Sequence, residues 1–323
     1  KGWYTMKILG TGSYLPENIV TNDDLAKIMD TSDEWIASRT GIRKRHLVKE
    51  ETTAQMSAKA AKQALKEAGL KAEELDLIIV GTLSGDYVTP STACEVQAMI
   101  GADKAVAFDV NAACSGFMFA MNTAYAFIQS GIYQNALVIG AEILSRLMDW
   151  NDRSTCVLFG DGAGAAVVTA DEKGLLGFVQ GSDGTKGMVL ACKNRLNNNP
   201  LIKNSVEPDH VFMDGQEVYK FAVSTVPASI QAVLEEAGLE VSDIKYFLLH
   251  QANIRIIQSV AKRLKADINR FPTTLEHCGN ISAASVPILL DEVNKKGMLQ
   301  RGDKLVMAGF GAGLTWSAAV IEW

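Results

Sequence analysis

One cysteine stands where a nucleophile would be expected, at the junction of an apolar run and a helical run. Cys114 lies in the segment Val110-Asn-Ala-Ala-Cys-Ser-Gly-Phe117. The positive end of a helix dipole at that turn favours the thiolate, so we expect a lowered pKa for the Cys114 thiol. The small neighbouring residues allow a sharp turn and close approach of a substrate. A buried cysteine with a purely structural role is the alternative, because that is the usual fate of this residue type.

Two further polar residues also stand at the ends of predicted elements. His250 ends the apolar run Tyr246-Phe-Leu-Leu-His250, and ligands in open α/β folds gather at the carboxyl ends of strands. Acid–base chemistry or hydrogen bonding is therefore open to its imidazole, with a satisfied core histidine as the alternative. Asn280 lies in Cys278-Gly-Asn-Ile-Ser282 before another predicted helix, where an N-cap is the simpler role for an asparagine.

Three glycine-rich segments are candidate ligand-binding turns. The segment Gly309-Phe-Gly-Ala-Gly-Leu-Thr-Trp316 follows an apolar run, and the backbone N–H groups of such a turn can form an oxyanion hole. None of the three segments has the GxGxxG spacing of a dinucleotide site. We expect the other two, Gly10-Thr-Gly12 and Gly160-Asp-Gly-Ala-Gly164, to be hairpin turns.

The elements that must position these residues occur twice. Residues 65–82 and 234–251 align without a gap at one constant offset, so that the first copy begins at Leu65 and the second at Leu234. In each copy a helix ends at a glycine, Gly69 or Gly238, and a short loop leads to an apolar strand. Two later pairs of segments match in the same order: Leu137-Val-Ile-Gly-Ala141 with Leu305-Val-Met-Ala-Gly309, and Ala165-Ala-Val-Val168 with Ala318-Ala-Val-Ile321. Chance similarity of apolar strands is the alternative, but three matches in one order favour a duplication.

Apolar strands alternate with helices along both halves. The pattern predicts helices near residues 52–69, 91–101, 114–131, 216–238, 253–266 and 282–296, and strands near 76–82, 105–111, 136–142, 163–169, 246–250, 304–309 and 316–322. Strands that are apolar throughout imply sheets covered on both faces, and the alternation implies an α/β fold. Two such halves packed together place some helices between two sheets, and the uncharged helix after Cys114 fits that layer. The halves meet near residues 171–180, which divides the chain into residues 6–172 and 173–323.

Composition limits the possible functions. The 323 residues include 31 Lys+Arg and 37 Asp+Glu, a net charge of −6, which is typical of a globular protein of about two domains. The mild acidity and the lack of a basic cluster argue against nucleic acid as the main partner. Five cysteines without metal-ligand spacing indicate neither a disulfide framework nor a metal site, and favour a cytoplasmic protein. The uncharged stretch Val110–Ala141 is long enough to span a membrane, but its polar side chains indicate a buried helix.

Together, these motifs resemble those of the β-ketoacyl-acyl-carrier-protein synthase III family, the initiating condensing enzymes of bacterial type II fatty acid synthesis. The resemblance runs from Lys7 to Trp323. Its markers are Gly10-Thr-Gly-Ser-Tyr-Leu-Pro16, Thr31-Ser-Asp-Glu-Trp-Ile36, Arg39-Thr-Gly-Ile-Arg43, Ala112-Ala-Cys-Ser-Gly116, Phe159-Gly-Asp-Gly-Ala-Gly-Ala165, His250-Gln-Ala-Asn253, Gly279-Asn280 and Gly311-Ala-Gly-Leu-Thr-Trp316. It implies the thiolase fold, in which two duplicated βαβαβαββ halves stack as a five-layered αβαβα sandwich, and a homodimer.

The resemblance makes Cys114, His250 and Asn280 the catalytic set. Cys114 would attack an acyl-CoA thioester and hold the acyl group. His250 Nε2 and the Asn280 amide would donate hydrogen bonds to the thioester oxygen of malonyl-acyl-carrier protein as it loses CO₂. The backbone N–H groups of Cys114 and Ala312 would form a second oxyanion hole, and Ala312 stands where glycine is frequent. The expected substrates are these two thioesters, with no metal, no other cofactor, no nucleic acid and no membrane partner.

The same resemblance assigns residues to CoA binding. Trp35 and Arg153 would sandwich the adenine by aromatic and guanidinium stacking. Arg39 would bind a CoA phosphate, and Asn253 would face the pantetheine channel.

Acyl-pocket and docking residues follow from the resemblance as well. Phe310 would lie against the active site, and Thr89 would help to cap the acyl pocket of the partner subunit. The small size of Thr89 suggests room for primers beyond acetyl. Arg255, Lys262 and Arg263 would form a basic face for the acidic carrier protein, with ordinary solvated charge as the alternative.

Two other functions stay open at this point. A relative that only transfers acyl groups, or condenses other substrates in secondary metabolism, would share most of these motifs, although Asn280 favours decarboxylative condensation. The order Cys114, His250, Asn280 also occurs in papain-like cysteine peptidases. The segment around Cys114 lacks the Gln and the Cys-Trp of that family, and the duplication argues against it.

Overall fold

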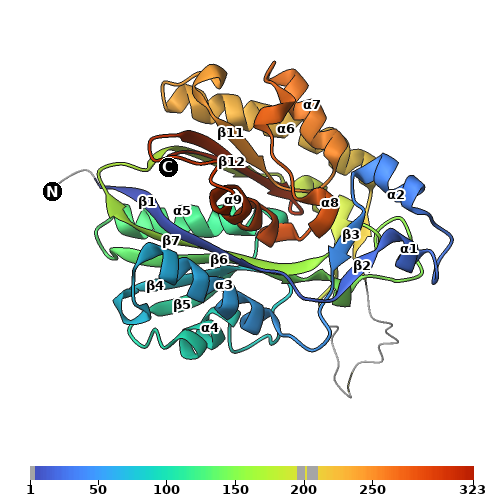
Figure 1. Ribbon diagram of the computed structural model, residues 1–323, viewed down its shortest axis with the longest axis horizontal. Coiled ribbons are helices and arrows are strands. Elements are labelled where there is room, and N and C mark those ends of the chain that lie inside the picture. The colour runs from blue at the N-terminus through green and yellow to red at the C-terminus, as the bar shows by residue number, and fades with distance from the viewer. Residues whose placement is uncertain (1–3, 195–200, 202–209) are drawn as a thin grey trace.

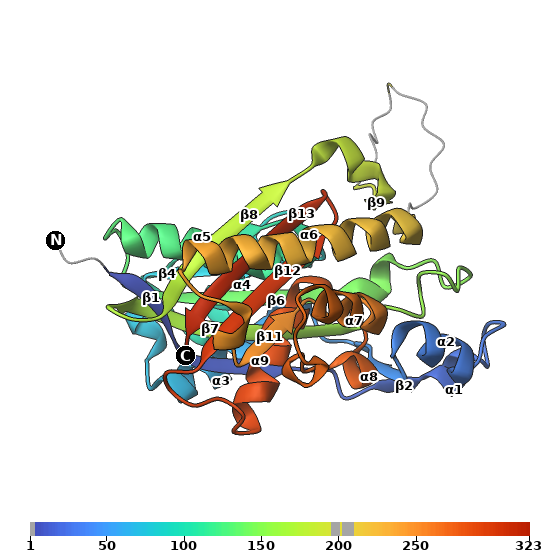
Figure 2. The same cartoon turned by 90° about the horizontal axis from the view of Figure 1, so that it is seen from above.

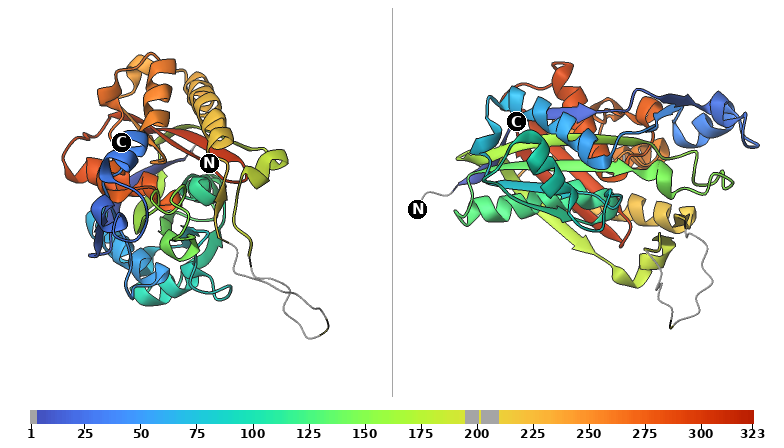
Figure 3. Two further views of the ribbon diagram at one scale, coloured as in Figure 1. Left: turned by 90° about the vertical axis from the view of Figure 1, so that its right-hand side faces the viewer. Right: turned by 90° about the horizontal axis from the view of Figure 1, so that it is seen from below.

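The chain folds into five layers in which two β-sheets alternate with three layers of helices (Figure 1). The computed structural model describes residues 4–194, 201 and 210–323. The outer layers are α3 (Thr53–Ala68) with α4 (Thr92–Ile100), and α6 (Gly215–Glu236) with α7 (Ile254–Arg263); the central layer is α5 (Gly116–Gln129) with α9 (Ser285–Lys295). The view from below in Figure 3 shows α3 and α4 lying over the sheet of the N-terminal half. The expected five-layered α/β sandwich is confirmed.

The N-terminal sheet has five strands in the order β1-β7-β6-β4-β5. Their bounds are β1 (Thr5–Tyr14), β4 (Leu77–Gly81), β5 (Val106–Val110), β6 (Asn135–Ile143) and β7 (Asp161–Asp171). β4 runs parallel to both of its neighbours, whereas β7 runs antiparallel to β6 and to β1. The parallel strands are apolar because helices cover both faces of the sheet.

The C-terminal sheet repeats this order with one strand fewer in the described part of the chain. It runs β11-β12-β13-β8, with bounds β8 (Leu175–Ser182), β11 (Tyr246–Leu249), β12 (Lys304–Gly311) and β13 (Thr315–Glu322). At the constant offset between the halves, the counterpart of β5 begins at Leu275, where the chain instead forms the short helix α8 (Leu275–Cys278). Among the residues that the structure describes, strand pairing near this point consists of one isolated bridge between Asn280 and Phe159.

Smaller elements flank the two halves near one end of the sandwich. They are β2 (Ile19–Thr21), α1 (Asn22–Leu25), α2 (Asp33–Thr40) and β3 (Lys44–His46) in the first half, and β9 (Leu190–Ala191) with β10 (Phe212–Met213) in the second. Seen from above, α2 lies next to α7 (Figure 2). This contact joins an insertion of the N-terminal half to the helix that follows His250.

The glycines expected in two hairpin turns lie in strands instead. Gly10 and Gly12 belong to β1, and the segment from Gly160 leads directly into β7. A Cβ on Gly12 would stand 2.2 Å from the Ala60 carbonyl oxygen of α3. A Cβ on Gly164 would stand 2.6 Å from the Ile288 nitrogen of α9. These glycines therefore allow a helix backbone to approach the strand closely.

The helices of the central layer pack against both sheets. α5 has no charged residue and packs between the sheets through side chains such as Phe117 and Met121. Leu289 and Leu290 of α9 join the same apolar cluster, which Leu248 of β11 and Val138 of β6 extend on either side. The prediction that the helix after Cys114 lies between two sheets is confirmed. No helix in the described residues is both long and apolar enough to cross a membrane.

Candidate active site

A cavity of about 700 Å³ opens where the two halves meet, and the three predicted catalytic side chains all line it. Cys114 comes from the N-terminal half, whereas His250 and Asn280 come from the C-terminal half. Phe310, near the end of β12, and Ala312, in the turn between β12 and β13, line the same cavity. Residues that are far apart in the chain thus meet in one place.

A tight turn between β5 and α5 holds Cys114. The residue lies in the short 3₁₀ helix η2 (Ala113–Ser115), and Ala113 has a φ of +45°. The β12–β13 turn fastens this segment from the opposite half, since Thr315 Oγ1 donates to the Ala112 carbonyl at 3.2 Å. Gly311 of the same turn passes so close that a Cβ on it would stand 2.6 Å from the Cβ of Cys114. The strained turn and the close glycine fit a site that presents one thiol to a cavity.

Burial controls the acidity of this thiol. The loss of solvation raises the pKa of Cys114 to about 12, and the nearby Glu142 carboxyl adds to the rise, while the Ser282 hydroxyl opposes it. The expectation of a lowered pKa from the start of the helix is therefore wrong for the resting protein. Desolvation of the thiolate in the buried site is the largest cause of this rise.

His250 follows β11 and is neutral in this environment. Its side chain is almost completely buried, and desolvation lowers the pKa of the imidazole to about 3. The ring of Phe310 meets the imidazole edge to face, with 5.0 Å between centroids and 72° between planes. His250 Nδ1 is buried and has no hydrogen-bond partner in the described part of the chain. A neutral imidazole can donate from Nε2 when Nδ1 is unprotonated.

The pH dependence of stability tests this neutral state. His250 has a pKa of 6.5 when exposed in the unfolded chain and about 3 in the folded one. The unfolded chain therefore binds the extra proton first, and stability falls as the pH drops below 6.5. Between pH 7.5 and pH 5 we expect the parent to lose about 2 kcal/mol more free energy of unfolding than His250→Gln. Urea denaturation at both pH values measures the difference, and equal losses would contradict a buried neutral imidazole.

Backbone and side-chain bonds fix Asn280 on both sides. Its N–H donates to the Leu158 carbonyl at 2.9 Å, and its own carbonyl accepts from the Gly160 N–H at 3.0 Å. The Oδ1 atom accepts from the Ser282 N–H at 2.8 Å, at the start of the 3₁₀ helix η7 (Ser282–Ala284). Asn280 therefore caps this turn through Oδ1. Its Nδ2 group is the part of the side chain that can donate to a ligand.

The duplication extends into the site itself. Ser282 has a φ of +44°, which matches the +45° of Ala113, its counterpart at the constant offset between the halves. Asn111 Oδ1 accepts from the Ala113 N–H at 3.3 Å, just as Asn280 accepts from Ser282. One turn is therefore used twice, and it carries a thiol in the first half and a ligand-facing amide in the second.

The residues predicted to bind CoA lie at the outer end of the site. The guanidinium carbons of Arg39 and Arg153 stand 4.7 and 5.0 Å from the centroid of the Trp35 ring. Arg153 also pairs with Asp30 at 3.1 Å. Asn253 caps α7 and donates through Nδ2 to the Arg39 carbonyl at 3.0 Å. Of these residues, Asn253 alone lines the cavity. Trp35 and Arg39 belong to α2, and Arg153 packs on the Trp35 ring from outside that helix.

The predicted docking and acyl-pocket residues take different positions. Arg255, Lys262 and Arg263 are all exposed on α7, and Arg255 Nη2 also donates to the Ser38 carbonyl at 3.0 Å. Thr89 is exposed and is not among the residues that line the cavity of its own chain. Its predicted role concerns the pocket of a second subunit and stays a prediction.

One buried carboxyl group near the site was not predicted from the sequence. Glu142 in β6 is fully buried, and its Oε2 accepts from the Leu83 N–H, from Thr82 Oγ1 and from Ser84 Oγ. Desolvation raises the pKa of this carboxyl to about 7. The available signal was a single acidic residue that interrupts the apolar run from 136 to 143.

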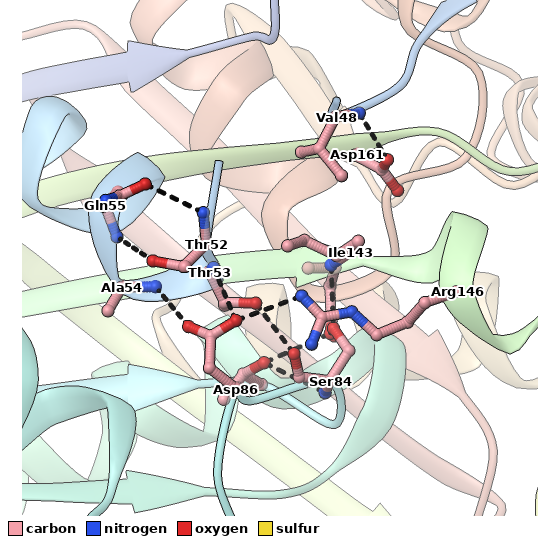
Figure 4. A network of polar contacts seen from close by, with 12 residues as sticks. Val48, Thr52, Thr53, Ala54, Gln55, Ser84, Asp86, Ile143, Arg146 and Asp161 are labelled. Carbon is pink, nitrogen blue, oxygen red and sulfur yellow. Dashed lines mark hydrogen bonds and ion pairs between the residues drawn. The ribbon is translucent and has the colours of Figure 1, made fainter. Parts of the chain in front are cut away.

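Ser84 connects this carboxyl to a polar network under α3 (Figure 4). Its Oγ accepts from the Ile143 N–H at 2.8 Å, and its carbonyl accepts from Thr53 Oγ1 at 2.8 Å. Asp86 accepts from the N–H groups of Thr53 and Ala54 and pairs with Arg146 at 3.1 Å (Figure 4). The loop after β4 is thereby held against the start of α3.

Comparisons with known proteins cover almost the whole chain. The model of 3-oxoacyl-acyl-carrier-protein synthase III matches residues 108–184, and the model of the C-terminal part of that family matches residues 234–323. Beta-ketoacyl-acyl-carrier-protein synthase III of Clostridium acetobutylicum is 50% identical over 321 residues, 99% of each chain. The crystal structure of 3-oxoacyl-acyl-carrier-protein synthase III from Aquifex aeolicus has a TM-score of 0.93 at 46% identity, over 98% of this chain and 100% of that one. A priming β-ketosynthase of the R1128 polyketide pathway has a TM-score of 0.92 at 37% identity, over 98% and 96%.

The duplicated halves, five layers and a thiol facing an imidazole and an amide define an enzyme of the thiolase fold. Within that class, the identity of half of all residues over the full length decides the family. The chain belongs to the 3-oxoacyl-acyl-carrier-protein synthase III family. The papain-like alternative is set aside, because these relatives share both the fold and the full length of the chain.

Proposed function

We propose that this enzyme condenses an acyl-CoA primer with malonyl-acyl-carrier protein. The products are 3-ketoacyl-acyl-carrier protein, CoA and CO₂, and an acyl group on Cys114 is the intermediate. The observation that carries the proposal is the meeting of Cys114, His250 and Asn280 in one cavity between the two halves. Membership of the synthase III family supports the same reaction.

Acyl transfer to Cys114 is the first half of the reaction. The thiol attacks the carbonyl carbon of the acyl-CoA, and CoA leaves from the tetrahedral intermediate. The N–H groups of Cys114 and Ala312 are proposed to hold the oxyanion, since Gly311 brings the two segments into contact. Ala312 is not one of the residues with positive φ, so its backbone conformation is an ordinary one for alanine. Alanine in place of the frequent glycine therefore keeps the donor.

Decarboxylation of the malonyl group is the second half. Loss of CO₂ places negative charge on the thioester oxygen, and the carbanion then attacks the acyl group on Cys114. His250 Nε2 and Asn280 Nδ2 are proposed to donate to that oxygen. Burial keeps His250 neutral, and the Ser282 N–H occupies Asn280 Oδ1, so each side chain offers a hydrogen and no charge. Donors fixed in place in this way stabilise developing charge without reorganising.

Binding of the two thioesters is proposed to use the end of the site near α2 and α7. Trp35, flanked by Arg39 and Arg153, offers an aromatic face for adenine together with positive charge for phosphate. Asn253 lines the cavity, and the pantetheine chain of CoA would pass it on the way from that face to Cys114. The exposed cations Arg255, Lys262 and Arg263 on α7 suit an acidic carrier protein that delivers its thioester at the same end.

We also propose a homodimer. The outermost strand of the N-terminal sheet, β5, leaves one edge unpaired in the described chain, and Val106 on it is 47% exposed. Tyr87 and Val88, just before Thr89, are 62% and 72% exposed. An uncovered edge beside apolar side chains suits pairing with a second copy of the chain. The same pairing would bring Thr89 towards the pocket of the partner subunit.

A condensation assay tests the proposal. The parent and Cys114→Ser are incubated with radiolabelled acyl-CoA primers and malonyl-acyl-carrier protein. We expect the parent to form 3-ketoacyl product and CO₂, and Cys114→Ser to form neither above about a thousandth of the parental rate. Acylation of the parent at Cys114 without CO₂ release would instead support the acyltransferase alternative. Ranking the primers by chain length and branching tests the inference from Thr89 and the alternative of secondary metabolism.

A further inference from the structure

His250 depends on its backbone for its orientation. Its Nδ1 atom is buried and has no hydrogen-bond partner in the described part of the chain, so no such bond turns the imidazole. The ring of Phe310 restricts the imidazole from one side, with 5.0 Å between the two centroids. The direction of Nε2 therefore depends on how firmly the peptide group that carries His250 is held.

That peptide group is held from both sides. A trans peptide directs its N–H and its C=O to opposite sides of a strand. The His250 N–H donates to the Ala308 carbonyl of β12 at 2.8 Å. On the other side, the Leu249 carbonyl accepts from Nε2 of Gln251 at 2.7 Å. A neighbouring strand therefore anchors one end of this peptide, and a side-chain amide anchors the other.

The amide stands where the first half has a strand. The C-terminal sheet ends at β11 in the described chain, whereas β4, its counterpart, pairs on that side with β5. Thr82, the counterpart of Gln251 at the constant offset between the halves, donates through its backbone N–H to the Val110 carbonyl of β5 at 3.1 Å. In the second half the Gln251 side chain supplies one donor and one acceptor, as a peptide group would.

The acceptor end of the same amide reaches the segment that leads to Asn280. Gln251 Oε1 accepts from the Thr274 N–H at 2.9 Å, and the Thr274 carbonyl accepts in turn from the Cys278 N–H at 2.9 Å across α8. Asn280 follows shortly after the end of that helix. One side chain therefore joins the strand end that carries His250 to the helix that precedes Asn280.

Gln251 does not face the cavity. Its side chain is fully buried and is not among the residues that line the cavity, although His250 and Ala252 on either side of it both line it. The oxygen and the nitrogen of its amide each bond to backbone inside the protein. A buried amide that is bonded at both ends makes the segments around it rigid.

We propose that Gln251 aligns the two donors of the decarboxylation step, His250 Nε2 and Asn280 Nδ2, by joining the segments that carry them. It is a positioning residue, because it acts through His250 and Asn280 and does not contact the thioester. The inference rests on the proposed condensation. Two donors that must reach one oxygen tolerate little displacement, since about 1 Å at a reacting centre costs on the order of 100-fold in rate.

Replacing Gln251 with methionine removes both hydrogen bonds with little change in side-chain length. Gln251→Met leaves the Leu249 carbonyl and the Thr274 N–H without their partner, so the two segments can shift independently. The cavity lining is unchanged, because the substituted side chain lies behind it.

Asn135→Leu is the matched control. Asn135, at the start of β6, also joins two segments through a side-chain amide and does not line the cavity. Its Nδ2 donates to the Glu74 carbonyl at 3.0 Å, and its Oδ1 accepts from Thr169 Oγ1 at 2.7 Å. This variant therefore loses the same kind of link at a place where no reacting group is attached.

Two rates are measured for each protein: acylation of Cys114 by acyl-CoA, and release of labelled CO₂ from malonyl-acyl-carrier protein by the acylated enzyme. We expect Gln251→Met to release CO₂ roughly 10- to 100-fold more slowly and to be acylated at the parental rate. The loss should lie in kcat and not in KM, because the binding surface is unchanged. Asn135→Leu should match the parent in both rates.

A double-variant comparison tests whether Gln251 acts through His250. In His250→Ala the Nε2 donor is already absent, and no second donor remains to be aligned. Adding Gln251→Met to that variant should therefore slow CO₂ release by a much smaller factor than it does in the parent. An equal factor on both backgrounds, or equal slowing of acylation and CO₂ release, would overturn the inference, since a general loss of structure affects every step.

The outcomes separate this inference from the proposed function. A parent that is acylated but releases no CO₂ contradicts the proposed condensation itself. A parent that condenses normally, with Gln251→Met releasing CO₂ at the parental rate, overturns the role of Gln251 alone. Thermal unfolding of every variant shows whether a slow rate reflects lost structure.

Gln251→Glu decides the matter if the methionine variant does not fold. A neutral carboxyl at this position donates to the Leu249 carbonyl and accepts from the Thr274 N–H, whereas a carboxylate has no donor. Burial raises the pKa of the fully buried Glu142 to about 7, so we expect the introduced carboxyl to be neutral at pH 6 and ionised at pH 9. The rate of CO₂ release relative to the parent should fall between these pH values, and a constant ratio would overturn the inference.

Discussion

Replacing Asn280 with aspartate is expected to slow decarboxylation of malonyl-acyl-carrier protein by about 100- to 1,000-fold, the usual cost of one oxyanion-hole donor. Aspartate keeps the oxygen that accepts from the Ser282 N–H at 2.8 Å, so the turn before α9 is preserved. It replaces the donating Nδ2 with a second oxygen, which repels the negative charge that forms on the thioester. Acylation of Cys114 should proceed, because Asn280 takes no part in that step.

Release of labelled CO₂ and formation of acyl-enzyme are measured separately in this experiment. Asn111→Asp is the matched control, since Asn111 makes the same side-chain bond in the duplicated turn and also lines the cavity. We expect that control to retain most of the decarboxylation rate. Equal losses in the two variants would mean that charge in the cavity, and not the lost donor, causes the effect.

Adding one methyl group at Gly311 is expected to abolish acylation almost entirely. The new Cβ would stand 2.6 Å from the Cβ of Cys114 and 3.1 Å from its sulfur, distances that force either the thiol or the β12–β13 turn to move. A displacement of about 1 Å at a reacting centre costs on the order of 100-fold in rate. Because the oxyanion hole spans the same contact, we expect Gly311→Ala to lose at least that much.

Gly215→Ala provides the control for this prediction. Gly215 lines the same cavity, but a Cβ on it would meet no atom within 4 Å. Single-turnover acylation and thermal unfolding are measured for both variants. Gly215→Ala should behave like the parent, whereas a Gly311→Ala enzyme with parental acylation would show that the turn gives way without disturbing the thiol.

Elements with a strong hydrophobic period could be predicted from the sequence almost to the residue. The helix expected at 114–131 is η2 with α5, and the strand expected at 136–142 is β6, Asn135–Ile143. The apolar runs do not predict β1, because Thr5–Tyr14 mixes threonine, serine and glycine with few apolar residues. The glycines in β1 serve close packing against α3, a requirement that appears only when both elements are placed.

The sequence likewise predicts some features of the candidate site and not others. Strand ends and helix starts made Cys114 and His250 candidates, whereas Asn280 taken alone was read as an N-cap, and the family resemblance joined the three into a catalytic set. The acidity of Cys114 was predicted with the wrong sign, since its desolvation comes from packing of the second half onto the first. Glu142 has no spacing signature at all, because its hydrogen-bond donors Thr82, Leu83 and Ser84 lie in the loop after β4, far from it in the sequence.

The position of α5 and α9 in the central layer determines how the site responds to local unfolding of the protein. Cys114 and Asn280 are attached to the beginnings of α5 and α9, which lie between both sheets. Amides in such helices exchange with solvent through the largest unfolding unit of a domain, whereas the outer helices and loops fray independently. We therefore expect the amides of α5 and α9 to be among the last to exchange, so that local unfolding elsewhere leaves the thiol and the amide aligned.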